Sequence, residues 1–299
     1  MDGLVIENGI LQKYEGTAKR VSLPAEVCSV GGRAFEKSCA EEIVMPHALR
    51  EIGHGAFWYC EGLKEVILPD TVETVGEGLF VGCASLARVT LPLSMTHLPE
   101  DTFRGCKSLE KIALPEGITY LADSALEGCA SLQKITLPRG TVSVGMRALA
   151  GCAALEEITL PEGLLRIKLD AFSGCGCLSS LTLPASLDSL ESAFDGCISL
   201  KELHFLRKER FHADIGIFDG LPSPLQVEFG GASADFEASV APSYGELYHV
   251  TMGDFARGYR YPMFHRTLGK AFECRVLCHG DNKELTLHGA PYDQVEGPF

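Results

Sequence analysis

The sequence predicts an α/β repeat fold: a solenoid of 23-residue units with a parallel ladder of strands and a cap at each end. The string Gly-Cys-x-Ser-Leu starts at Gly82, Gly105 and Gly128, so successive copies are 23 residues apart. A Leu-Pro pair has the same spacing, and self-similarity at a period of roughly 20 to 50 residues is typical of solenoids. The prolines of this series are Pro69, Pro92, Pro115, Pro138, Pro161 and Pro184.

Apolar residues return at about seven positions of each unit. After Pro69 they are Val72, Val75, Phe80, Cys83, Leu86 and Val89, followed by the leucine of the next Leu-Pro pair. One unit cannot bury this face alone, whereas stacked units share a continuous core. We therefore expect these columns to point inward.

The end of each unit predicts a short strand. Residues 132–138, Leu-Gln-Lys-Ile-Thr-Leu-Pro, alternate apolar and polar side chains before a proline that cannot donate to a ladder. Copies of this strand in successive coils are expected to pair in parallel, about 4.8 Å apart. The Ala-Phe-x-Gly-Cys stretch is too short for a stable helix and predicts a helical turn. A glycine before the cysteine suits a tight or left-handed backbone.

Together these motifs resemble the BspA-like (Treponema-type) leucine-rich repeats. Their consensus runs roughly L-x-x-I-x-L-P-x-x-[VI]-x-x-I-x-x-x-A-F-x-x-C, and residues 21–205 follow it through about eight units. The resemblance implies a leucine-rich-repeat solenoid, curved, with a strand ladder on one side. Several members of that family are bacterial surface or secreted proteins that engage other proteins.

Three segments are expected along the chain. Residues 1–22 form an N-terminal cap, residues 23–226 form the solenoid of about eight units plus one degenerate unit, and residues 227–299 form a C-terminal cap. The C-terminal cap contains an aromatic-rich insertion at 244–268. The first unit is atypical, as terminal units of a solenoid are, because Cys39 lies off the cysteine column. The N-terminal cap residues expected to cover the first coil are Ile6, Ile10, Leu11 and Tyr14.

Composition restricts the partner and the compartment. The net charge of −14 disfavours nucleic acid and anionic membrane surfaces, which need basic patches. No run approaches the roughly 18 apolar residues of a membrane span, so we expect no membrane insertion. The segment Met1–Gly9 does not have the pattern of a signal peptide. We expect a cytoplasmic protein, or a surface or secreted one if the native N-terminus lies elsewhere.

The cysteine column has two interpretations, a redox or metal-binding stack or a small core residue. Reactive thiols need exposure and positive neighbours, whereas this column is flanked by leucine and phenylalanine columns. We favour reduced core cysteines and expect no metal and no cofactor. Cys274 and Cys278, with His279 and His288 nearby, lack a clean second ligand pair for zinc. The core column is Cys60, Cys83, Cys106, Cys129, Cys152, Cys175 and Cys197.

Outward positions supply the candidate binding residues. Arg88, Lys111 and Lys134 form a basic centre with acidic flanks on the ladder face, which is either a recognition groove or a solvated sheet surface. The pair Trp58-Tyr59, inserted between the phenylalanine and cysteine columns, is either a contact site or packing against the next coil.

The aromatic-rich insertion is either a binding loop or an enlarged cap, since aromatic residues with arginines are typical of binding hot spots. Its candidate residues are Tyr244, Tyr248, Arg257, Tyr259, Arg260, Tyr261 and Phe264.

The function that this pattern favours is a non-enzymatic scaffold for protein–protein interaction, with an unknown protein partner. A monomeric state is compatible with an extended acidic solenoid. The alternative is a surface adhesin or glycan-binding protein. An enzyme with a site in the C-terminal region, around His249, Asp254 and His265, is a weaker hypothesis because no motif organises these residues.

Overall fold

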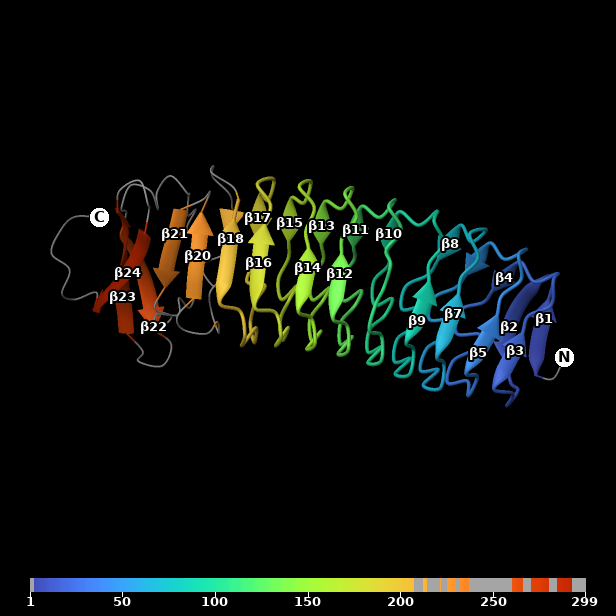
Figure 1. Cartoon of the computed structure of the whole chain (residues 1–299). Coiled ribbons are helices and arrows are strands. Elements are labelled where there is room, and N and C mark those ends of the chain that lie inside the picture. Colours follow the sequence, from blue (N-terminus) through green and yellow to red (C-terminus); the bar gives the residue numbers. More distant parts are fainter. Residues whose placement is uncertain are drawn as a thin grey trace.

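The computed structural model describes residues 3–206 and 221, together with the backbone of the strands at 212–213, 225–229, 232–236, 260–265, 270–279 and 284–291. Successive coils follow one another along a single axis from the N-terminal strands (Figure 1). The fold is a solenoid of about 23-residue turns, as the sequence predicts.

Each coil contributes a longer strand to the predicted parallel ladder, here called the long-strand ladder. Its register joins residues 23 apart, such as Lys134 with Glu157. The ladder is interrupted after β9 and again after β14. Its members in the solenoid are β3 (Arg20–Ser22), β5 (Glu42–Val44), β7 (Glu65–Ile67), β9 (Arg88–Thr90), β12 (Lys134–Thr136), β14 (Glu157–Thr159), β16 (Ser180–Leu183) and β18 (Glu202–Phe205).

A second parallel ladder runs along the opposite side of each coil, here called the short-strand ladder. Its strands have two residues each, and in those up to residue 190 the first residue points outward and the second inward. Two residues are too few to show alternation in the sequence. The members are β4 (Ser29–Val30), β6 (Glu51–Ile52), β8 (Thr74–Val75), β10 (His97–Leu98), β11 (Tyr120–Leu121), β13 (Ser143–Val144), β15 (Arg166–Ile167), β17 (Ser189–Leu190) and β19 (His212–Ala213).

Antiparallel strands lie at both ends of the array. At the N-terminus, β1 (Leu4–Glu7) pairs antiparallel with β2 (Ile10–Tyr14), and β2 starts the short-strand ladder beside β4. Leu11 and Tyr14 are buried against the first coil. After β20 (Leu225–Phe229), which is parallel to β18, the strand order is β21 (Ala232–Phe236), β24 (Glu284–Pro291), β23 (Lys270–His279) and β22 (Arg260–His265). The predicted cap boundaries stay predictions.

The core consists of the predicted apolar columns. Phenylalanine rings of successive coils stack with centroids 5.3–5.4 Å apart from Phe35 through Phe57 and Phe80 to Phe103. The leucine, isoleucine and valine columns are buried as well, with Val75, Val89 and Ile158 partly so. Offset ring stacks of this kind add to the burial of apolar area. Stacking the columns therefore builds one continuous core through the described coils.

The third side of each coil is a chain of hydrogen-bonded turns, and residues 3–206 contain no helix. In the coil of Pro69 the Cys83 amide donates to the Phe80 carbonyl over 3.0 Å. The α part of the predicted class therefore consists of turns. The residue before each column cysteine is left-handed, and glycine fills this place in the six later coils, with φ between 70° and 76°.

A seam crosses both ladders between the coils of Pro69 and Pro92. In the short-strand ladder, β8 does not pair with β10. In the long-strand ladder, β9 does not pair with the next coil, where Lys111 forms only an isolated bridge to Lys134. Proline explains part of this interruption. In the equivalent position of other coils, the amides of Gly76 and Ala122 donate to the preceding coil over 2.8 and 3.0 Å, whereas Pro99 has no amide hydrogen to donate. The turn side stays bonded, with Gly82 donating to the Arg104 carbonyl over 2.8 Å.

Candidate functional site

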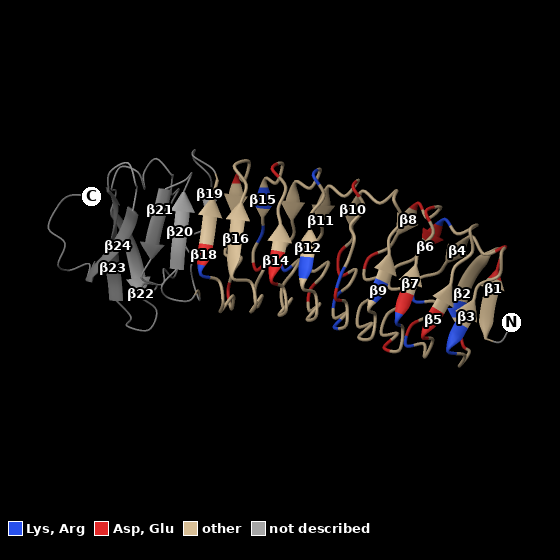
Figure 2. Cartoon of the chain, viewed as in Figure 1, with Lys and Arg blue, Asp and Glu red and all other residues tan. Residues whose placement is uncertain are grey.

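The predicted basic centre lies on the outward face of the long-strand ladder, where its charges are largely paired. Arg88 donates to Glu65 over 2.9 Å, and Lys134 donates to Glu157 over 2.7 Å. Basic and acidic strands follow one another along this face (Figure 2). The Arg88 hydrogen bond lowers the pKa of Glu65, and Glu157 raises the pKa of Lys134. Lys111 has no ion-pair partner among the described residues.

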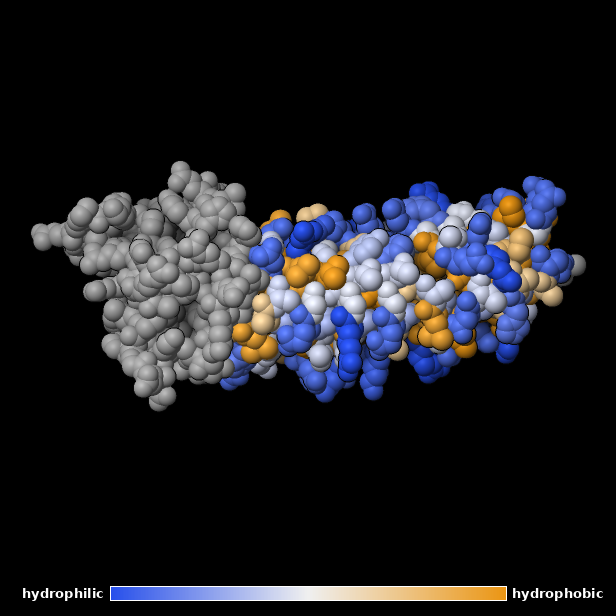
Figure 3. Space-filling model, turned by 90° about the horizontal axis from the view of Figure 1, so that it is seen from above, coloured by the Kyte–Doolittle hydropathy of each residue, from blue (hydrophilic) through white to orange (hydrophobic). Residues whose placement is uncertain are grey.

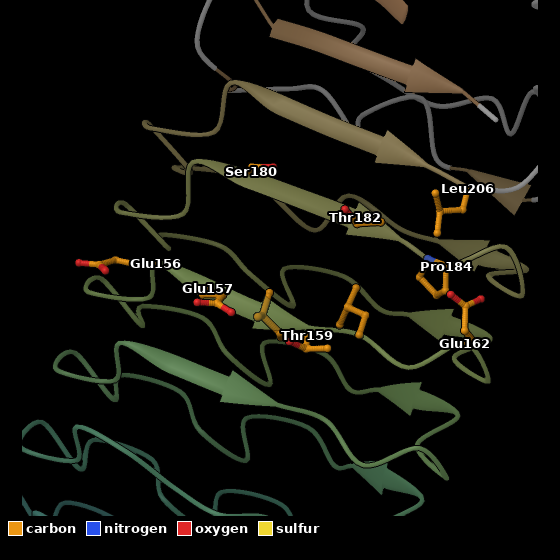
Figure 4. A pocket seen from close by; sticks show the side chains of 10 residues that line it. Glu156, Glu157, Thr159, Glu162, Ser180, Thr182, Pro184 and Leu206 are labelled. Atoms are coloured by element: carbon orange, nitrogen blue, oxygen red, sulfur yellow. The ribbon is translucent and has the colours of Figure 1, made fainter. Parts of the chain in front are cut away.

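A shallow depression follows this face where the long-strand ladder is interrupted between β14 and β16. Its volume is about 420 Å³. Ile158, Leu160, Pro184 and Leu206 supply its apolar lining. Threonine and serine hydroxyls and three glutamates supply its polar lining; Glu162 lies near Pro184 and Leu206, whereas Glu156 lies at the far end (Figure 4). Such a lining accommodates a cationic or hydroxyl-rich group.

The seven column cysteines are free thiols in the core. Each Sγ donates to a main-chain carbonyl of the preceding coil, from Cys60 to Phe35 over 2.9 Å through Cys197 to Phe172 over 3.1 Å. Burial raises the pKa of the Cys129 and Cys152 thiols well above the ordinary value. A buried thiol that resists ionisation is a poor nucleophile and a poor metal ligand. No group of residues in the described part of the chain is arranged to hold a metal ion.

Trp58 is a packing residue of the turn side. The Arg33 guanidinium lies 4.2 Å from the centre of its ring, and the His54 ring meets it edge-on at 4.9 Å. A Cβ added at Gly55 or Gly78 would lie under 3 Å from the indole, so both glycines accept its close approach. These contacts favour the packing interpretation for Trp58.

Tyr59 differs from its partner in the predicted pair. Its φ is 53°, in the column where later coils have glycine, and the residue is 47% exposed. One side of its ring covers Gly82, where a Cβ would come within 2.4 Å of the tyrosine. The backbone amide of Tyr59 is fixed by a 2.7 Å bond to the Val81 carbonyl. The turn side thus presents one ordered aromatic side chain.

Sequence analysis missed the outward face of the short-strand ladder. There the rings of His97 and Tyr120 stack at 4.9 Å, and Arg166 lies two coils further along the same column. This column can be located in the sequence as the fifth residue after each Leu-Pro proline. Its residue type differs from coil to coil, so it does not appear as a repeated position.

Several predicted residues lie outside what the structure describes. Tyr244, Tyr248, Arg257 and Tyr259 fall outside the described residues, as do His249 and Asp254. Arg260, Tyr261, Phe264 and His265 lie in β22. The residues considered and disfavoured as zinc ligands, Cys274, Cys278, His279 and His288, lie in β23 and β24. Only the backbone of these three strands is described.

Comparison with protein families gives one match. The model of the BspA-type leucine-rich repeat region matches residues 28–152 and 119–214 in six copies. No curated protein matches the chain. In the described residues, no helix has the length and apolar character needed to cross a membrane.

Solved structures of leucine-rich repeat proteins resemble the chain. One from Eubacterium ventriosum is 25% identical with a TM-score of 0.52, covering 58% of this chain and 50% of that one. The leucine-rich repeat protein of T. pallidum is 25% identical, covers 72% and 83% of the two chains, and has a TM-score of 0.40. A leucine-rich cell surface protein from Faecalibacterium prausnitzii is 20% identical, covers 65% and 83%, and has a TM-score of 0.41. The chain thus spans about half the length of the Eubacterium protein.

Proposed function

Because this chain belongs to the BspA-type leucine-rich repeat family, we propose that it is a non-enzymatic scaffold that binds another protein. Tyr59 carries the proposal for where binding occurs. Its left-handed conformation does not single it out, since Arg33, Lys37, Asp101, Ser124, Arg147 and Asp170 also have a positive φ. What distinguishes Tyr59 is a half-exposed aromatic ring held over Gly82, where the six following coils have glycine and offer no side chain.

The surroundings of Tyr59 suit an anchor residue. Trp58, which directly precedes Tyr59, packs between Arg33 and the glycines of its own and the next coil. An aromatic side chain that is ordered before binding loses little conformational entropy on association. Tyrosine is also one of the residue types that dominate interface energetics. Tyr59 therefore forms the contact that we assign to the partner.

The paired charges of the long-strand ladder support a secondary role for that face. Exposed ion pairs such as Lys134 with Glu157 contribute little to stability or affinity, and a partner would have to displace them. The basic centre predicted from the sequence therefore ranks below Tyr59 as a contact site.

The test is a capture experiment from cognate cell lysate with three forms of the full chain: wild type, Tyr59→Gly and Lys37→Gly. Lys37 is the matched control, since it occupies the same column one coil earlier with φ 57°. Both variants replace a strained residue with the residue of the later coils, so both are expected to fold, as circular dichroism would verify. We expect Tyr59→Gly to lose about 30-fold in affinity for a captured protein, the effect of removing a hot-spot residue. Capture that is equal with all three forms contradicts a site at Tyr59.

The cytoplasmic localisation stays a proposal. Ten free cysteines in the described part of the chain fit a reducing compartment. Fractionation of cells that express the full-length native protein tests it, and recovery from the cell surface or the medium would favour the adhesin alternative.

A further inference from the structure

The outward column of the short-strand ladder contains a stacked pair of rings. The ring centres of His97 and Tyr120 lie 4.9 Å apart, and the ring planes are 12° from parallel. This separation matches the spacing of about 4.8 Å between neighbouring strands, because β10 and β11 pair in register. Each coil therefore advances the column by a distance at which one aromatic ring stacks on the next.

The stack ends at Tyr120, although the column continues. The next two coils have Ser143 and then Arg166 in register with it. Serine is too small to cover the second face of the Tyr120 ring, and Tyr120 is 41% exposed. The Arg166 guanidinium makes no cation–π contact with that ring. One step of the column, over Ser143, therefore lacks a ring between Tyr120 and Arg166, and we call this step the stacking position.

The spacing at the stacking position fits a single ring. Tyr120 and Arg166 are two strands apart, which is about 9.6 Å at about 4.8 Å per strand. A planar ring midway between them would lie about 4.8 Å from each. Rings stack with their centres about 4.5–7 Å apart, and a guanidinium is attracted to a ring whose centre lies within about 6 Å. One ring thus satisfies both neighbours at once, whereas two rings do not fit.

The Arg166 side chain is available to a ligand. It is exposed, and its neighbours in the ladder are serines on both sides, Ser143 and Ser189. Within the part of the chain that the structure describes, it has no ion-pair partner. Guanidinium is weakly hydrated and stacks on aromatic faces, so it can close the stacking position from the side opposite Tyr120.

Carboxylates border the stacking position and disfavour an acidic occupant. A Cβ added at Gly145, two residues beyond Ser143, would lie 2.7 Å from Asp123 Oδ1. Asp188 and Glu191 flank the strand that follows Arg166. The net charge of −14 also repels phosphates, which excludes the bases of a nucleic acid. An aromatic side chain is neutral, with a negative face that suits the guanidinium and a positive edge that suits the carboxylates.

The surroundings favour a single anchor over a broad apolar contact. Seen from above, the described coils show small apolar groups, in orange, separated by polar side chains (Figure 3). On such a surface, one ring held on both faces can supply much of the binding energy.

We propose that the stacking position receives one aromatic side chain of a partner protein, with its ring between Tyr120 and the Arg166 guanidinium. The His97 ring supports Tyr120 from behind, so the partner ring extends a stack that is already ordered. This contact goes beyond the site at Tyr59, which lies on the turn side before the seam, and does not depend on binding there.

The test uses three small probes with the full chain: N-acetylphenylalaninamide, N-acetylcyclohexylalaninamide and methyl β-galactoside. Phenyl and cyclohexyl groups have the same number of ring carbons, but only phenyl has an aromatic face. NMR of ring-labelled tyrosines follows binding, and the signals lost in Tyr120→Ala identify Tyr120. We expect the phenyl probe to shift these signals with a dissociation constant of about 10 mM. The cyclohexyl probe should bind at least about threefold more weakly, and the galactoside should cause no shift.

Two variants test the neighbours of the stacking position. Arg166→Ala should weaken the phenyl probe by about threefold and leave the cyclohexyl probe unchanged, because only the cation–π contact is lost. Ser143→Phe should abolish the shifts, since its own ring fills the stacking position. Ser29→Phe is the matched control in the same column, where the neighbours Ile10 and Glu51 offer no ring or guanidinium. It should leave binding unchanged and have a thermal midpoint no higher than that of Ser143→Phe.

Four results would overturn the proposal. They are equal binding of the phenyl and cyclohexyl probes, no shift of Tyr120 by the phenyl probe, unchanged shifts in Ser143→Phe, and a midpoint of Ser143→Phe below that of Ser29→Phe. A shift caused by the galactoside alone would assign the position to a glycan and overturn it too. Sedimentation that shows a wild-type dimer and a monomeric Ser143→Phe variant would assign it to a ring of a second copy, with the same consequence.

Discussion

Alkaline pH should unfold this protein through its buried thiols. Burial raises the pKa of six column cysteines above the ordinary value of 9.0, to about 12 for Cys197. The native state therefore keeps these protons at a pH where the unfolded chain releases them. The unfolded state binds fewer protons above about pH 9, so the free energy of unfolding falls as the pH rises. Below about pH 9 the thiols are protonated in both the folded and the unfolded state, so they do not make the free energy of unfolding depend on pH.

The magnitude follows from the number of thiols. At about pH 10, one pH unit above the unfolded value, each thiol favours the unfolded state by about 1.4 kcal/mol. Six thiols in coils that unfold together favour it by about 8 kcal/mol, which is comparable with the whole stability of an ordinary domain. We expect the protein to be stable near neutral pH and marginal or unfolded near pH 10.

Urea unfolding followed by circular dichroism, with a reductant, measures this dependence between about pH 7.5 and pH 10. Cys129→Ala should reduce the decrease in the free energy of unfolding between these pH values by about one sixth, whatever it does to stability at neutral pH. Cys177→Ala, which changes an exposed cysteine outside the column, is the control and should leave this decrease unchanged. The reasoning fails if the free energy of unfolding is the same at both ends of the range, or if Cys129→Ala keeps the full dependence.

Three other changes test the coil itself. Gly128→Ala should lower the thermal midpoint, with a loss of about 1–2 kcal/mol in stability, because φ is 72° there. Gly176→Ala is the control and should be tolerated, since Gly176 has an ordinary φ and an added Cβ would lie 3.9 Å from the nearest atom. Equal midpoints of the two variants would refute the conformational argument. Pro99→Ala should introduce an amide at position 99 that is protected in hydrogen exchange, and rapid exchange of this amide would show that proline is not what keeps the seam open. Lys134→Ala should leave the thermal midpoint unchanged, since its ion pair is fully exposed, and a clear drop would assign that pair a structural role.

The core could be predicted because its columns repeat at a fixed period. Every coil supplies an apolar residue at the same places, so Phe80 or Leu86 is identified by its equivalents in the neighbouring coils. The outward faces could be predicted only in part, because their residues differ from coil to coil. The pairing of Arg88 with Glu65 was nevertheless available from the sequence, since residues 23 apart are neighbours in a ladder of this period. The same rule places Lys134 opposite Glu157, so the acidic partners of the predicted basic centre could also be identified from the sequence.

The short-strand ladder and Tyr59 were harder to predict for physical reasons. A strand of two residues gives no alternating pattern, so the outward positions of Tyr120 and Arg166 were not recognised as one face. The left-handed conformation of Tyr59 follows from a column that the later coils fill with glycine, but its exposure depends on how Trp58 packs beside it. Packing of that kind is set by the three-dimensional neighbours and not by the period.

The seam at Pro99 divides both ladders into an N-terminal and a C-terminal part. Bonds on the turn side continue across it, and between the two ladders Ser94 donates to the Val72 carbonyl over 2.8 Å, so the two parts stay joined along two edges of the coil. Tyr59 lies on the N-terminal part and Tyr120 on the C-terminal part. The relative orientation of these two side chains is therefore set by the packed core and by these bonds, and not by an unbroken ladder.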